Sequence, residues 1–214
     1  MGEITRNDQF GKAIIDTVSN YGIKTVLEIG SWDGTGSTQC FIEGMEKLDN
    51  KRLICLEVYM DRFKQLCANT AKHSWVECYN QSSISYDNML YKNFDDIWES
   101  PYNFIPKEDQ NGSTKLVVSE WFRQDIEMMN KFRSGYIEEH PDETYDAVLI
   151  DGGEFSGYSE FKLLRDKAKF FILDDYYKAF KNRQVADELS KDPNWEAIAG
   201  NKHTRNGWAI FKRK

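Results

Sequence analysis

The sequence predicts the α/β fold class, with a doubly wound, mostly parallel sheet of seven strands. Short and nearly all-apolar runs, such as 51–57, alternate with segments of helical periodicity, which is the pattern of strands covered by helices on both faces. The run 24–29 leads into a glycine-rich turn at 30–36 and then into a helix-like segment, 37–48. Strand, glycine turn and helix N-terminus, in this order, bring a backbone close to a nucleotide-like ligand.

The other predicted elements follow in the order that a Rossmann-like sheet requires. A first helix is expected over 7–21, capped by Asn7 or Asp8 and ended by Gly22. Beyond the elements already named, strands are expected at 74–79, 145–151, 168–173, 195–199 and 207–212, and helices at 61–71, 158–167 and 179–190. The last two strands read as a terminal antiparallel pair.

Residues 91–140 interrupt this alternation between the third and fourth strands. Aromatic side chains are interleaved here with two prolines, and a helix is expected from 119 to 136. The segment is too long for an ordinary connection, so it is either a lid over an acceptor site or a packing or dimer surface. No linker indicates a second domain, and we expect residues 1–214 to form one. Whether the chain forms a homo-oligomer is left open.

Composition limits the class of partner. Lys and Arg total 28 against 35 Asp and Glu, a net charge of −7, and no basic run occurs, which disfavours a nucleic acid partner. No apolar segment approaches membrane-spanning length and no signal region opens the chain, so we expect a cytoplasmic protein without a membrane partner. The four cysteines form no CxxC pair and are expected to be small buried residues in a reducing compartment.

The glycine-rich turn differs from a dinucleotide-binding loop. Glu28 lies two positions before the first glycine, Gly30, and Gly34 and Gly36 follow at a spacing that is not GxGxxG. A carboxylate at this point would repel a pyrophosphate, but it can accept hydrogen bonds from an ammonium group, directly or through water. The alternative is an ordinary strand–turn–helix whose glycines only allow close packing.

Acidic residues also end three further strands. Glu57, at the tip of the second strand, is placed to accept hydrogen bonds from ribose hydroxyls, although a solvated strand-end carboxylate is the alternative. Asp151 ends the fourth strand, and Asp174 and Asp175 end the fifth. Three converging carboxylates repel one another unless a cation neutralises them, and oxygen ligands favour Mg²⁺. Alternatively, Asp174 and Asp175 cap the next helix while Asp151 faces solvent or a cofactor.

Two sets of motifs resemble known families. The stretch 26–38 (VLEIGSWDGTGST) resembles motif I of the class I S-adenosylmethionine (SAM)-dependent methyltransferases. The segments 150–158 (IDGGEFSGY) and 172–176 (ILDDY) resemble the paired motifs of macrocin-type, metal-dependent sugar O-methyltransferases and related small class I enzymes. This resemblance implies Mg²⁺ at Asp151, Asp174 and Asp175. It also implies a SAM site made of Glu28, Gly30, Ser31, Trp32, Gly34, Gly36, Ser37, Thr38, Glu57, Gln81, Ser82 and Asp151, with Gln81 and Ser82 beside the adenine.

The chain departs from the macrocin-type pattern at Gly153, where those enzymes carry a second acid that is a candidate base. Glu154 is the candidate base here, with Asp151 as the neighbouring catalytic and metal-binding residue. The expected reaction is in-line transfer of the sulfonium methyl to a hydroxyl of a sugar or glycosylated small molecule. The alternatives are a metal-independent small-molecule methyltransferase and a methyltransferase-fold binding protein that has lost catalysis.

Overall fold

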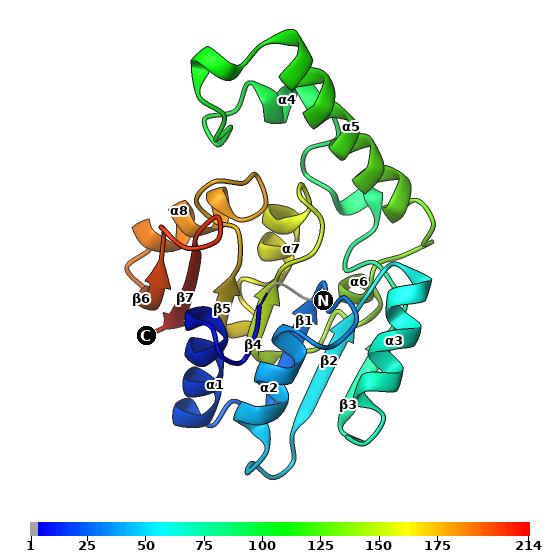
Figure 1. Ribbon diagram of the computed structural model, residues 1–214, viewed down its shortest axis with the longest axis vertical. Helices are drawn as coiled ribbons and strands as arrows, with labels where there is room; N and C mark the ends of the chain where they lie inside the picture. Colours follow the sequence, from blue (N-terminus) through cyan, green and yellow to red (C-terminus); the bar gives the residue numbers. More distant parts are fainter. Residues whose placement is uncertain (1–3) are drawn as a thin grey trace.

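A seven-stranded sheet runs through the protein (Figure 1), and the computed structural model describes residues 4–214. The strand order is β3-β2-β1-β4-β5-β7-β6. Strands β1 to β5 are parallel, and β7 pairs antiparallel with both β5 and β6. The strands are β1 (Thr25–Ile29), β2 (Arg52–Leu56), β3 (Val76–Tyr79), β4 (Tyr145–Ile150), β5 (Ala168–Leu173), β6 (Trp195–Asn201) and β7 (Trp208–Arg213). The predicted fold class, with its antiparallel C-terminal strand, is confirmed.

Helices cover both faces of the sheet because the central strands are apolar on both sides. The helices are α1 (Gln9–Tyr21), α2 (Ser37–Met45), α3 (Met60–Thr70), α6 (Tyr136–Glu139), α7 (Gly157–Leu164) and α8 (Arg183–Lys191). Buried residues of α1, α2 and α3 pack with Val26 and Leu53 on one face. Those of α6, α7 and α8 pack with Leu27 and Ile54 on the other, which makes the sheet doubly wound.

The segment between β3 and β4 extends away from the sheet, at the top of Figure 1. It contains two 3₁₀ turns, η1 (Tyr86–Asn88) and η2 (Lys107–Asp109), and the helices α4 (Phe94–Trp98) and α5 (Gly112–Met129). Buried side chains of α5, among them Phe122 and Met129, join the core on the α7 face. The insertion is therefore packed onto the domain along α5, where Phe122 contacts Phe155, and also through Phe104, which contacts Phe180.

The predicted starts of two helices are wrong by four residues or more. Helix α5 was expected at 119–136, but it begins at Gly112 because the Asn111 side chain accepts a hydrogen bond from the Thr114 backbone nitrogen, as an N-cap does. Helix α8 was expected at 179–190, but it begins at Arg183. The preceding residue, Asn182, is fully buried and its amide donates to the backbone oxygens of Ile150 and Asp174, which holds 174–182 as a loop.

No helix within residues 4–214 is long and apolar enough to cross a membrane.

Candidate nucleotide and metal site

The glycine-rich turn lies across the ends of three neighbouring strands. The backbone nitrogens of Gly30 and Ser31 donate to the Leu56 oxygen at 3.1 and 3.0 Å, and the Asp151 nitrogen donates to the Ile29 oxygen at 3.0 Å. Gly30 has a φ of +88°, and a Cβ on it would lie 2.1 Å from the Asp151 backbone oxygen. Only glycine therefore allows β1 and β4 to end so close together.

Glu28 faces helix α2 and not a cavity. Its side chain is fully buried, and its two carboxylate oxygens accept hydrogen bonds from the hydroxyls of Ser37 (2.6 Å) and Thr38 (2.7 Å). The Cys55 thiol also donates to Glu28, at 3.3 Å. In the structure this carboxylate anchors the first turn of α2, and its role toward a ligand ammonium, directly or through water, stays a prediction.

A first cavity, of about 250 Å³, opens at the carboxyl ends of β1 to β4. The predicted site residues that line it are Gly30, Trp32, Glu57, Gln81, Ser82, Asp151 and Glu154. It is also lined by residues that sequence reasoning missed, namely Asp125, Met128 and Met129 of α5 and Glu160 of α7. The insertion therefore forms one wall of this cavity.

Glu57 is held in this cavity wall by a backbone N–H group two residues further along the chain. The side chain is buried and accepts a hydrogen bond from the Tyr59 nitrogen at 2.8 Å. Burial raises the pKa of this carboxyl above its usual value. The end of β2 thus presents a positioned acceptor, as the ribose hypothesis requires.

A second cavity, of about 350 Å³, lies on the other side of Asp151. Its predicted site residues are Gly30, Ser31, Trp32, Gly36, Ser37, Asp151, Asp174 and Asp175, and Lys181 and Arg205 also line it. Gly30, Trp32, Asp151 and Gly152 line both cavities, so the two adjoin there. Two further predicted SAM residues lie in neither cavity. Thr38 is fully buried beneath the turn, and a Cβ on Gly34 would lie 2.8 Å from Leu66 of α3.

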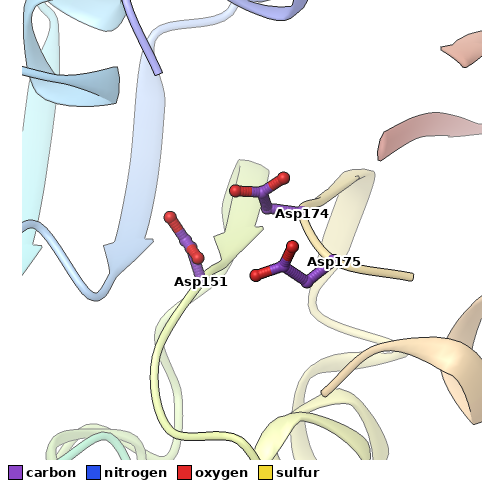
Figure 2. A group of neighbouring side chains, drawn as sticks. All are labelled: Asp151, Asp174 and Asp175. Atoms are coloured by element: carbon purple, nitrogen blue, oxygen red, sulfur yellow. The ribbon is translucent and has the colours of Figure 1, made fainter. Parts of the chain in front are cut away.

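The three aspartates converge as predicted (Figure 2), Asp151 from the end of β4 and the other two from the end of β5. One carboxylate oxygen of each lies within 4.8 Å of the others. Three closely spaced carboxylates are a donor set that suits a hard divalent cation such as Mg²⁺. The residues present therefore fit such an ion.

Two cations of the chain itself already contact these aspartates. The Lys181 amine lies 2.8 Å from Asp151 and 3.2 Å from Asp175, and Arg205 forms an ion pair with the fully buried Asp174. Burial raises the pKa of Asp151 to about 7, since Lys181 opposes this effect only in part. Nothing in the sequence distinguished Lys181 or Arg205 from the other basic residues of their loops.

Glu154, the candidate base, also lines the first cavity. Its carboxylate accepts a hydrogen bond from the Phe180 backbone nitrogen at 2.8 Å, which ties the loop after β4 to the loop after β5. Burial raises the pKa of Glu154, and a raised pKa favours proton uptake near neutral pH.

Comparison with known proteins supports the fold. No protein-family model and no curated protein sequence matches the chain. Among solved structures, it is similar to an O-methyltransferase from Bacillus cereus in complex with SAH, with a TM-score of 0.58 and 14% identity over 95% of this chain and 80% of the other. TomG from Streptomyces achromogenes, an O-methyltransferase involved in tomaymycin synthesis and solved with SAM, gives a TM-score of 0.56 and 11% identity over 95% and 79%.

The SAH-bound methyltransferase PaMTH1 from Podospora anserina also gives a TM-score of 0.56, with 12% identity over 95% of this chain and 77% of the other. Identities this low establish the architecture alone. The strand order agrees with it. The structure has the Rossmann-like fold of the class I SAM-dependent methyltransferases.

Proposed function

We propose that the chain is a SAM-dependent O-methyltransferase of a small molecule. The observation that carries the proposal is the pair of adjoining cavities at the carboxyl ends of the parallel strands, with Asp151 where they meet. A nucleoside in the first cavity would have its ribose at Glu57. Its sulfonium would then lie toward Asp151 and the acidic cluster, where an acceptor hydroxyl can approach in line.

In this proposal Asp151, Asp174 and Asp175 would hold Mg²⁺, which lowers the pKa of an acceptor hydroxyl when it is bound. Glu154 would take up the hydroxyl proton. The acceptor we propose is a hydroxyl of a sugar or glycoside, on the resemblance of the two acidic motifs. We also propose that the protein acts on small molecules and not on nucleic acid, because its net charge is −7. Its place of action, in this proposal, is the cytoplasm.

A second candidate is a metal-independent small-molecule methyltransferase. Lys181 and Arg205 already neutralise two of the three aspartate charges, and this observation favours it. The two candidates differ in what a chelator does to cofactor binding and to turnover.

Calorimetric titration with S-adenosylhomocysteine (SAH), with Mg²⁺ or with EDTA, tests both candidates. Binding of SAH at micromolar concentration supports the cofactor site, and no binding at millimolar SAH contradicts it. Mg²⁺ binding that is lost in Asp174→Asn, but kept in the exposed-site control Asp142→Asn, supports the metal. SAH binding and turnover that are unchanged by EDTA and by Asp174→Asn favour the metal-independent enzyme.

A further inference from the structure

Gly153 leaves space that a residue of the insertion fills. A Cβ on Gly153 would lie 2.9 Å from a carboxylate oxygen (Oδ2) of Asp125, which belongs to α5. The same oxygen accepts a hydrogen bond from the Phe155 backbone nitrogen at 3.0 Å. The carboxylate of Asp125, from helix α5, therefore lies beside Gly153, the position at which macrocin-type enzymes carry an acidic residue.

A second carboxylate stands on the same side of the first cavity. Glu160 is 1% exposed, and its Oε1 accepts hydrogen bonds from the hydroxyls of Ser83 (2.5 Å) and Ser156 (2.8 Å). Its other oxygen, Oε2, is buried and has no hydrogen-bond partner among the described residues. Buried polar atoms are almost always paired. The unpaired Oε2 therefore indicates that this wall of the first cavity, formed by Asp125, Glu160 and the loop 81–83, has too few hydrogen-bond donors for its acceptors.

Two hydroxyl donors of this wall are already used by the protein itself. The Ser83 hydroxyl donates to Glu160, and the Ser82 hydroxyl donates to the Ile84 backbone oxygen at 2.7 Å. Because the carboxylates of Asp125 and Glu160 accept hydrogen bonds, a ligand that pairs with them must bring hydrogen atoms of its own.

The direction of a bound nucleoside follows from the strand order. With the ribose at Glu57 and the sulfonium toward Asp151, the base extends to the remaining part of the first cavity, between the loop 81–83 and α5. Adenine carries a 6-amino group with two donor hydrogens at one edge. A 6-oxo purine carries only an acceptor at that place.

We propose that Asp125 accepts a hydrogen bond from the 6-amino group of the cofactor's adenine, so that the insertion helix reads the base. This inference rests on the proposed function, because the nucleoside is taken to be that of SAM. Asp125 is then a specificity residue of the cofactor site. In this proposal helix α5 is part of the cofactor site, whether or not it also contacts the molecule that is methylated.

The test is calorimetric titration of the full chain with SAH and with its 6-oxo analogue, S-inosylhomocysteine. We expect the wild type to prefer SAH by at least about tenfold, because the analogue places an acceptor against a carboxylate. In Asp125→Asn the amide can donate to the 6-oxo group, so we expect the preference to fall at least about fivefold. Asp125→Ser, which is too short to reach, should weaken SAH binding and also lower the preference.

Glu127→Gln is the matched control, since it removes one charge from the exposed side of the same helix and should leave both affinities unchanged. Near-UV circular dichroism verifies that each variant is folded. If the wild type does not bind SAH, the proposed function fails and the inference with it. If the wild type binds SAH and S-inosylhomocysteine with equal affinity, the inference alone is overturned. The same holds if Asp125→Asn keeps the wild-type preference for SAH.

Discussion

Among single residues, the buried carboxylate of Glu28 decides how the glycine turn meets helix α2. Replacing it by Ala would leave the hydroxyls of Ser37 and Thr38 without their acceptor in a buried place. We expect Glu28→Ala to lower the free energy of unfolding by about 2–4 kcal/mol, measured by urea denaturation. The exposed Glu46, at the end of the same helix, is the control, and Glu46→Ala should change stability by less than about 0.5 kcal/mol. A loss below about 1 kcal/mol for Glu28→Ala would contradict this role.

Lys181 competes with any divalent cation for the aspartate oxygens, because its amine lies 2.8 and 3.2 Å from two of the three side chains. We therefore expect Lys181→Met to tighten Mn²⁺ binding at least about tenfold, as read from the free Mn²⁺ signal in electron paramagnetic resonance. The variant should also be less stable than wild type without metal, and Mn²⁺ should raise its Tm more than that of the wild type.

Lys178→Met, on the exposed part of the same loop, should leave Mn²⁺ binding at the wild-type level. Unchanged or weaker Mn²⁺ binding by Lys181→Met would show that the ammonium does not oppose the metal.

The residues that sequence reasoning found and missed differ in how their position is encoded. Asp151, Asp174 and Asp175 follow apolar strands, and the ends of parallel neighbours meet at one edge of a sheet. Asp125 and Lys181 reach the site from an insertion and a loop, which have no periodic pattern that fixes their direction. The contacts of Glu28 with helix α2 were missed, because the strand pattern does not show which of two faces a polar side chain contacts.

At the level of elements, helices α1 and α2 approach closely through Gly44. A Cβ on Gly44 would lie 2.8 Å from the Val18 Cβ and 3.1 Å from the Ile15 backbone oxygen. We expect overpacking to cost Gly44→Ala about 1–3 kcal/mol. Alanine regains roughly 1 kcal/mol in helix propensity, so the net loss of stability should be up to about 2 kcal/mol. Urea denaturation measures this change.

The same substitution at Gly112, the first residue of α5, is the control. Apart from its chain neighbours and the backbone of its own helix, no atom of residues 4–214 lies within 4 Å of a Cβ built there, so Gly112→Ala should leave stability unchanged or raise it slightly. Equal effects at the two positions would contradict the close approach of α1 and α2.

The elements that were predicted well are those buried on both sides. β5 was placed at 168–173, as observed, because an apolar run that only Lys169 interrupts, bounded by polar residues, leaves little choice of ends. The insertion was predicted poorly. Its helix α5 has only three buried residues along its length, so apolar spacing carries little signal, and its start depends on one side chain, Asn111.

For the whole molecule, the gathering of acidic side chains at one edge of the sheet lowers the stability of the folded state. Burial raises the pKa of Glu57, Asp125, Asp151, Glu154, Glu160 and Asp174, all of which lie around the two cavities. A raised pKa means that the folded chain holds these protons more tightly than the unfolded chain. The site is therefore assembled against a free-energy penalty that grows as the carboxyls ionise, and the core on both sheet faces must offset it.

This penalty predicts how stability depends on pH, and Glu160 isolates one contribution. Above its unfolded pKa of 4.5, an unfolded chain has lost the Glu160 proton that the folded chain still binds. Fewer protons in the unfolded state make the slope of unfolding free energy with pH negative, so stability falls as pH rises from 4.5 toward the folded pKa. One such group contributes at most about 1.4 kcal/mol per pH unit.

Glu160→Gln keeps an oxygen for Ser83 and Ser156 but cannot ionise, so its unfolding free energy should fall less between pH 5 and pH 8 than that of the wild type. Urea denaturation at both pH values measures the difference, with the exposed Glu127→Gln expected to follow the wild-type dependence. Parallel pH profiles for the wild type and Glu160→Gln would show that this carboxyl has the same proton affinity in the folded and unfolded chain. In that case, its burial beside the cavity would carry no penalty that a bound ligand has to relieve.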